Sequence, residues 1–182
     1  MKKITAPFDP EELKTLRAGD MVEISGIIYT ARDAAHARII KDLDNGTLKF
    51  SLKRACIYYV GPTPSKPSEI IGSCGPTSSY RMDSFTPRLL SEGILGMIGK
   101  GKRSKEVIEK IKTYGAVYFT AIGGAAALLK DRVKECEILD YEDLGPEALR
   151  KLKVENFPVT VTVDSLGNNL YELGRKKYLS GE

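Results

Sequence analysis

A loop bounded by glycines carries the side chains of this sequence that are best suited to chemistry. It spans residues 72–84 and reads Gly-Ser-Cys-Gly-Pro-Thr-Ser-Ser-Tyr-Arg-Met-Asp-Ser. Thr77, Ser78 and Ser79 offer hydroxyls, and Arg81 adds a planar fork of N–H donors that matches a carboxylate or a phosphate. If a helix begins among these hydroxyls, its free N–H groups favour an anion. The loop is a candidate anion site, although a strand-to-helix turn with a capping hydroxyl has the same composition.

Two further segments place cations after apolar runs. Arg32 follows the predicted strand Met21–Thr30 at the point where a helix should begin, which is where open α/β folds bind ligands. The run Gly-Lys-Gly-Lys-Arg-Ser at 99–104 places Lys100 after a short apolar segment and before a predicted helix at 105–114, an arrangement that favours anions. Taken alone, each segment also fits a surface arginine or a solvated basic turn.

The elements that must position these residues are read from apolar periodicity and from the breaks made by glycine and proline. Strands are predicted at 21–30, 48–52, 55–60, 94–98, 117–120, 136–139, 159–163 and 169–172, with a strand ending at 70–71. Helices are predicted at 9–17, from Arg32 to before the turn 44–46 with Asp33 as a candidate cap, at 82–92 in two pieces, at 105–114 and at 146–153. This alternation predicts an α/β fold, and the proline-rich connection 61–67 argues against a regular doubly wound sheet.

Composition limits the classes of protein to which this chain can belong. Its 182 residues, 42% of them hydrophobic, suffice for one well-packed domain. No apolar run is long enough to span a membrane and the first residues lack a signal pattern, so a cytoplasmic location is expected, without membrane contact. The net charge is +4 and lysines alternate with acids, which indicates a solvated surface and no nucleic-acid partner.

The inventory of metal ligands is poor. Cys56, Cys74 and Cys136 are far apart in the sequence, and His36 is the single histidine. They provide neither a disulfide framework nor a Cys-x-x-Cys pair. We therefore expect that this chain alone holds no metal and no iron–sulfur cluster.

A run of small residues follows the predicted strand at 117–120. Ile122-Gly123-Gly124 is followed by three alanines, and such residues either let a ligand approach the backbone or let a helix pack closely on a sheet. The run matches neither a dinucleotide-binding nor a P-loop fingerprint.

Four of these segments, taken together, resemble one family. The segments 32–36, 75–84, 99–104 and 121–124 are similar to motifs of the C-terminal region of class I fumarases, in the same order. The same region forms the β subunit of two-subunit fumarases and L(+)-tartrate dehydratases. The resemblance extends from about Val22 to Tyr171.

The resemblance implies a fold and a partner. The fold would be a swivelling β/β/α domain with mixed sheets and flanking helices, formed by residues 1–182 as a single domain. Residues of about 20–173 would make the catalytic part and residues 174–182 a polar tail. A 4Fe-4S cluster would be carried by a partner α subunit and not by this chain, in an assembly of two α and two β subunits.

The same resemblance assigns site residues. Matched by motif, Arg32, Arg81 and Lys100 would bind substrate, and Thr77 would bind substrate and act as the catalytic base. The sequence departs from the family at 78–80, where Ser-Ser-Tyr stands in place of a frequent Thr-Ala-Gly. This departure affects the pocket wall and the choice of dicarboxylate.

These roles fit one reaction, the reversible hydration or dehydration of a small dicarboxylate, with fumarate and malate expected before tartrate. The reaction removes a weakly acidic proton beside a carboxylate, and cations stabilise the charge that develops there. Threonine acts as a base only if cations stabilise its alkoxide. A small-anion-binding regulatory module without catalysis is the alternative, and a basic partner-binding domain stays open as a third.

Overall fold

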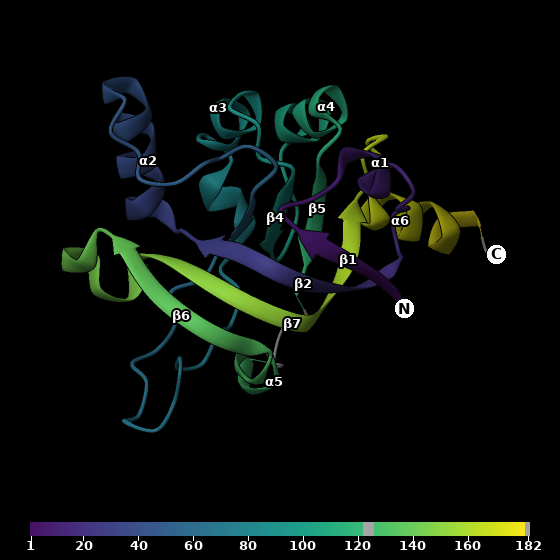
Figure 1. The fold of residues 1–182 in the computed structure, drawn as a ribbon. Helices are drawn as coiled ribbons and strands as arrows, with labels where there is room; N and C mark the ends of the chain where they lie inside the picture. Colours follow the sequence, from purple (N-terminus) through teal and green to yellow (C-terminus); the bar gives the residue numbers. More distant parts are fainter. Residues whose placement is uncertain (122–125, 181–182) are drawn as a thin grey trace.

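The computed structural model describes residues 1–121 and 126–180. Within them, seven strands form one mixed sheet in the order β1-β2-β3-β4-β5-β7-β6 (Figure 1). Neighbouring strands from β1 to β5 run parallel, whereas β7 runs antiparallel to β2, β5 and β6. The strands are β1 (Lys2–Ala6), β2 (Met21–Thr30), β3 (Cys56–Tyr58), β4 (Gly96–Gly99), β5 (Val117–Thr120), β6 (Val133–Asp140) and β7 (Leu149–Val163).

The long strand β7 closes the sheet on itself. It pairs with β2 from Arg150 to Thr160 and then with β5 up to Val163, so that β2, β3, β4, β5 and β7 form a closed, barrel-like sheet. Both β2 and β7 bend at the same place, where Gly26 and Asn156 adopt positive φ angles of 100° and 49°. A Cβ at Gly26 would overlap the carbonyl of Ala6, so glycine is required there for steric reasons as well.

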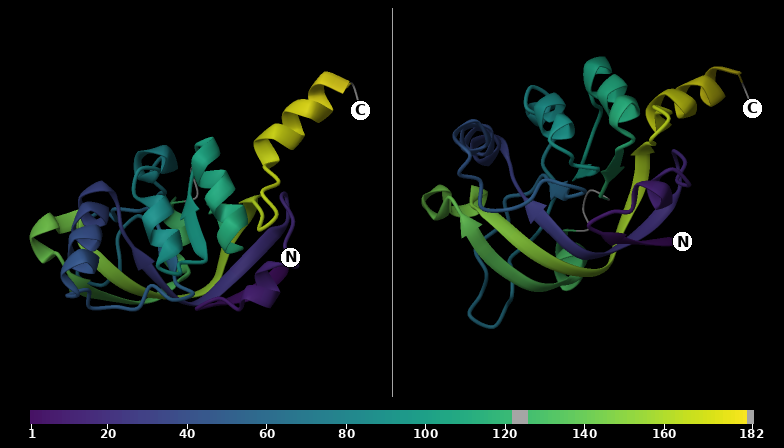
Figure 2. Two further views of the ribbon diagram at one scale, coloured as in Figure 1. Left: turned by 90° about the horizontal axis from the view of Figure 1, so that it is seen from above. Right: turned by 45° about the horizontal axis from the view of Figure 1, so that its top comes forward.

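Helices flank the sheet. Figures 1 and 2 show α2, α3 and α4 side by side along one side of the sheet and α5 on the opposite side, while α6 extends from the end of β7. No helix in the described part of the chain is long and apolar enough to cross a membrane. The helices are α1 (Pro10–Leu13), α2 (Asp33–Asn45), α3 (Thr86–Ser91), α4 (Lys105–Tyr114), α5 (Ala126–Asp131) and α6 (Leu170–Ser180), with short 3-10 helices η1 (Ser79–Met82) and η2 (Glu142–Glu147).

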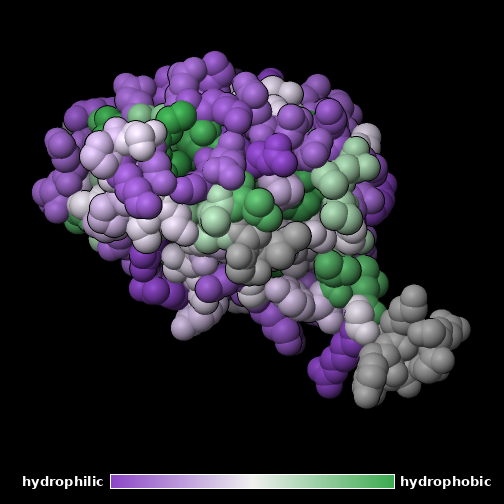
Figure 3. Space-filling view, turned by 90° about the horizontal axis from the view of Figure 1, so that it is seen from below, coloured by the Kyte–Doolittle hydropathy of each residue, from purple (hydrophilic) through white to green (hydrophobic). Residues whose placement is uncertain are grey.

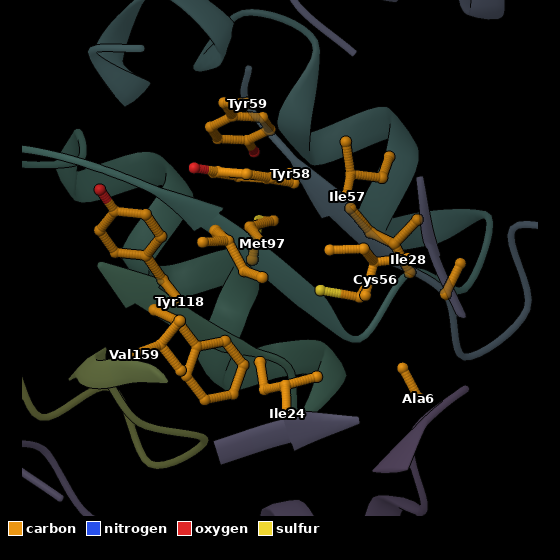
Figure 4. Close-up of a cluster of buried hydrophobic side chains, with 14 of the residues drawn as sticks. Ala6, Ile24, Ile28, Cys56, Ile57, Tyr58, Tyr59, Met97, Tyr118 and Val159 are labelled. Carbon is orange, nitrogen blue, oxygen red and sulfur yellow. The ribbon is translucent and has the colours of Figure 1, made fainter. Parts of the chain in front are cut away.

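The core lies between the closed sheet and these helices. Figure 4 shows Ile28 of β2, Cys56 and Tyr58 of β3, Met97 of β4 and Tyr118 of β5 converging on one cluster, and all five side chains are buried. Apolar, β-branched and aromatic residues favour such half-covered strands, and their burial contributes about 25 cal/mol for each Å² removed from water. The core thereby makes a rigid support for the loops at the strand ends.

Several sequence predictions are confirmed. Strand β2, helix α4 and strand β5 have the predicted bounds, and the segment 82–92 is divided between η1 and α3. Helix α4 shows why local signals suffice: the Ser104 side chain caps it by accepting from the Val107 N–H, and Gly115 ends it in the left-handed region. The coarse expectation of mixed α/β structure with flanking helices is also confirmed.

Other predictions are wrong. Most of the helix expected at 146–153 is the start of β7, which begins at Leu149, because pairing with β2 and β6 outweighs local helix propensity there. Instead of the strand expected at 169–172, helix α6 begins at Leu170, and the side chain of the preceding Asn169 accepts from the Tyr171 N–H as a capping residue does. No strand forms at 48–52 or 70–71, which lie in irregular connections.

Candidate functional site

The carboxyl ends of four parallel strands define the candidate site. Strands β2, β3, β4 and β5 run in one direction and end at the same edge of the sheet. Arg32 follows β2 by two residues, Tyr59 follows β3 directly and Lys100 follows β4 directly. The Thr77 N–H donates to the Tyr59 carbonyl at 2.7 Å. Arg32, Thr77 and Lys100 therefore lie at one edge, where α/β sheets bind ligands.

The loop that carries Thr77 is fixed against Lys100. The Ser79 N–H donates to the Lys100 carbonyl at 2.9 Å, and the Lys100 N–H donates to the Ser79 hydroxyl at 3.1 Å. Gly99 permits this approach, because a Cβ at this position would overlap the Ser79 hydroxyl oxygen. The loop is thus held directly against the end of β4.

Arg81 joins the same region through Asp33. Its Nε donates to Asp33 Oδ1 at 3.0 Å, and Asp33 directly follows Arg32 in the chain. The Arg32 guanidinium lies against Gly61, where a Cβ would come within 2.8 Å of Nη1. The structure therefore gathers all four residues that the sequence singled out, and their catalytic roles stay predictions.

His36 fixes the backbone of Arg32. Its Nδ1 lies 2.8 Å from the Arg32 carbonyl, which only accepts, so Nδ1 carries the proton. Complete burial lowers the pKa of His36 to about 4, against the raising effect of this hydrogen bond, and the ring is neutral at pH 7. The ring packs against Tyr59 and Phe85 at centroid distances of 5.4 and 5.6 Å. His36 supports the backbone at Arg32, and among the described residues it belongs to no group that could hold a metal ion.

Arg103 is a structural cation, which corrects one part of the sequence interpretation. The basic run at 99–104 suggested an anion-seeking loop, but the Arg103 side chain is 0% exposed and its Nε donates to Asp83 Oδ1 at 2.6 Å. Its Nη2 donates to the Thr86 hydroxyl at 2.7 Å, and its guanidinium carbon lies 4.9 and 5.3 Å from the ring centroids of Tyr118 and Tyr59. Lys100 and Lys102, in contrast, are exposed.

Tyr118 connects this buried cation with the Thr77 loop. Its hydroxyl lies 2.8 Å from both the Ser79 hydroxyl and the Gly101 carbonyl. Burial raises the pKa of Tyr118 far above its ordinary value, so the hydroxyl keeps its proton. The loop is therefore supported from below by Tyr118, which bonds to Ser79 and packs on the buried Arg103.

The Thr77 hydroxyl is not a helix cap. Helix η1 begins at Ser79 with Ser78 at the N-cap, and the Ser78 side chain makes no capping hydrogen bond. A four-residue 3-10 helix has little dipole, so the anion site does not rest on a helix at Thr77 as the sequence suggested. The 13-residue helix α2 instead begins at this edge, with Arg32 at its N-cap and no side-chain cap.

The chain's own thiols do not fit an iron–sulfur cluster. Cys56 and Cys74 are buried and burial raises the pKa of each thiol, to about 12 for Cys74. Among the described residues, no group of three His, Cys, Asp or Glu side chains is arranged to hold a metal ion. Such clusters need a set of converging thiolates. The motif residues 122–124 lie outside the described residues.

One hollow of the described surface lies outside the candidate site. Its volume is about 510 Å³, and its lining includes Pro62, Ile70, Ile138, Pro146 and Arg150 but none of the four candidate residues. Figure 3 shows the lower face, where apolar residues gather in separate patches among polar ones. The Arg81 side chain is 43% exposed. Lys100 is exposed as well, so these two candidate side chains are accessible to solvent.

Comparison with known proteins identifies relatives of this chain. The model of the fumarase C-terminus family matches residues 3–174. A Methanocaldococcus jannaschii protein named as an L(+)-tartrate dehydratase subunit beta is 41% identical over 92% of this chain and 89% of its own length. Fumarate hydratase 2 of Leishmania major is 40% identical over 88% of this chain, and the aerobic class I fumarate hydratase of Escherichia coli is 37% identical over 94%. The chain spans only 29% and 31% of those two longer proteins.

Proposed function

Because this chain belongs to the fumarase C-terminus family, we propose that it is the β subunit of an iron–sulfur hydro-lyase acting on a small dicarboxylate. The resemblance inferred from the sequence motifs is confirmed by the family match. The named relatives, fumarate hydratases and a tartrate dehydratase subunit, are hydro-lyases. We propose fumarate and malate as the first substrates to test and tartrate as the next.

One observation supports this proposal most: three cationic residues and one threonine lie at or near the carboxyl ends of strands β2, β3 and β4. Arg32, Arg81 and Lys100 supply the charges that hold two carboxylates, and the arginines supply paired N–H donors for them. Loss of the proton beside a carboxylate places negative charge on that group. Fixed cations stabilise this charge as it develops in the transition state more strongly than they stabilise the bound substrate, and this difference accelerates the reaction.

We assign Thr77 the role of catalytic base. Its hydroxyl has no capping function, and the loop that carries it is fixed to Lys100 through Ser79. A threonine alkoxide requires nearby positive charge, which Arg81 and Lys100 supply. In the direction of dehydration Thr77 takes the proton from carbon, and in the direction of hydration it returns that proton.

The cluster belongs to another polypeptide in this proposal. Class I fumarases are iron–sulfur enzymes, and the thiols of this chain do not fit a cluster. A 4Fe-4S cluster is therefore assigned to a partner α subunit, in an assembly of two α and two β subunits. The subunit name of the Methanocaldococcus relative supports such a partner.

The proposed domain is of the swivelling β/β/α type, with residues 1–182 as one domain and about 20–173 as its catalytic part. The closed sheet with helices along one side is compatible with a rigid body that closes onto a partner. The site then forms between the two subunits, which agrees with the exposure of Arg81.

The proposal is tested by Arg32→Lys and Arg81→Lys in the assembled complex. An ammonium group cannot reproduce two parallel N–H contacts, so the loss of one charge-assisted contact should cost about 1.5 to 3 kcal/mol, roughly ten- to hundredfold in kcat/KM. Arg88→Lys is the matched control, because Arg88 of α3 pairs with Asp44 and Glu92 away from the site. Kinetics like those of the wild type in both site variants would contradict the proposal.

A further inference from the structure

We infer that Asp33 and Glu147 are positioning residues for this site: each holds one site arginine at Nε and presents the terminal nitrogens to a substrate carboxylate. The inference rests on the proposed function. It explains why two negatively charged side chains lie beside a site for an anion, although their charge repels the substrate.

The contact between Asp33 and Arg81 is a direct hydrogen bond. Arg81 Nε donates to Asp33 Oδ1 at 3.0 Å, while Asp33 Oδ2 is buried without a hydrogen-bond partner among the described residues. Within that part of the chain, Nη1 and Nη2 of Arg81 make no hydrogen bond. A guanidinium that donates from Nε still has its terminal edge for two parallel contacts to a second carboxylate.

Glu147 pairs with Arg32 at the same nitrogen, Nε, as an ion pair without a hydrogen bond. Arg32 Nε and Glu147 Oε1 are 3.5 Å apart, and both atoms are buried without a hydrogen-bond partner in the described chain. Burial of opposite charges facing one another is favourable only if they stay paired. The pair therefore fixes the Arg32 side chain, which is also confined by its contact with Gly61.

The segment that carries Glu147 is itself clamped to helix α2. Arg38 of α2 donates from Nη1 and Nη2 to the two oxygens of Asp143 at 2.7 and 2.6 Å. Arg150 donates to the carbonyls of Gly145 and Pro146 at 2.9 and 3.0 Å. These contacts connect the segment that carries Glu147 to helix α2 and to strand β7.

Positioning matters because arginine has a long, flexible side chain. A guanidinium held at Nε loses fewer rotamers when it binds a carboxylate, so more of the binding energy is realised. Orientation also decides the rate, since a displacement of about 1 Å in a bound substrate can cost about a hundredfold. Simple electrostatics makes the opposite forecast, because removal of Asp33 leaves the site more positive.

The test is a double-mutant cycle in the assembled complex. Asp33→Ala should raise KM and lower kcat/KM about tenfold, and Asp33→Asn, which keeps an acceptor oxygen, should recover part of the loss. In an Arg81→Ala background, Asp33→Ala should change kcat/KM by less than about twofold, because no guanidinium remains to be positioned. In a second cycle, Glu147→Gln should lower kcat/KM in the wild-type background and have little effect in an Arg32→Ala background. Asp44→Asn is the control, since Asp44 pairs with Arg88 at the other end of α2.

Two results would overturn the inference. A lower KM for Asp33→Ala would show that Asp33 competes with the substrate, and effects that multiply in the double variant would show a general structural role. An inactive wild-type complex contradicts the proposed function instead, and the same cycle is then measured by calorimetry as fumarate affinity of the chain. In that experiment, the positioning role is overturned if Asp33→Ala binds fumarate as tightly as the wild type does, or if the wild-type chain binds no fumarate.

Discussion

Arg103→Met is expected to destabilise the fold strongly. The Arg103 side chain is 0% exposed and that of its partner Asp83 is 14% exposed, so the substitution leaves a largely buried carboxylate without its counter-charge. Removal of one member of a buried ion pair costs about 3 to 5 kcal/mol. The Ser104 N–H, which also donates to Asp83, offsets only part of this cost.

The magnitude converts to a measurable shift. For a chain of this length, 1 kcal/mol corresponds to about 2 to 4 °C in Tm, so the Tm of Arg103→Met should fall by about 6 to 20 °C. Thermal unfolding followed by circular dichroism measures the shift. Lys102→Met, an exposed neighbour, is the control and should change stability by less than about 0.5 kcal/mol.

The double variant Arg103→Met/Asp83→Asn separates charge from packing. Since it removes both charges, it should be more stable than Arg103→Met alone. A Tm for Arg103→Met equal to that of Lys102→Met would refute the reasoning. A double variant less stable than Arg103→Met would show that the Asp83 charge is not the source of the cost.

Three further predictions follow from the site. The pKa of His36 is about 4 in the folded chain and about 6.5 in the unfolded chain. The contribution of neutral His36 to the free energy of unfolding is therefore complete above pH 6.5, and up to about 3 kcal/mol of it is lost as the pH drops to 4. Urea unfolding of His36→Asn should lack this part of the pH dependence, and the same pH profile in the variant and the wild type would refute the neutral assignment. Thr77→Val should abolish turnover and solvent deuterium exchange at the substrate carbon while calorimetric dicarboxylate binding persists, whereas exchange at the wild-type rate would exclude Thr77 as the base. The pure chain, treated anaerobically with iron and sulfide, should form no stable cluster, and a stable cluster absorbance would contradict the assignment of the cluster to a partner.

Sequence alone predicts those elements of this fold that are determined by residues close together in the chain. Helix α4 carries its own cap, apolar stripe and terminal glycine, and β2 has an apolar run of sufficient length. Strand β7 lacks such independence, because its first half becomes a strand only through pairing with β2 and β6. The closure of the sheet therefore could not be predicted from periodicity.

The same distinction applies to the candidate site. Arg32, Thr77, Arg81 and Lys100 stand in recognisable motifs at predicted strand ends, and the structure brings them to one edge. The roles of Asp33, Glu147 and Arg103 depend on partners from other elements, as in the contact of Asp33 with Arg81. No spacing in the sequence indicates these contacts, so they become visible only in the folded chain.

The measurement that tests the central claim most directly is an anaerobic dehydratase assay of this chain with a candidate α subunit that carries three cluster cysteines. Malate and tartrate are tested for dehydration and fumarate for hydration. The absorbance of fumarate follows its formation from malate or its loss on hydration, and the formation of oxaloacetate follows turnover of tartrate. We predict that the complex is active and that the isolated chain is inactive. Turnover by the isolated chain, or a stable complex that binds phosphate and converts none of the three dicarboxylates, would contradict the account.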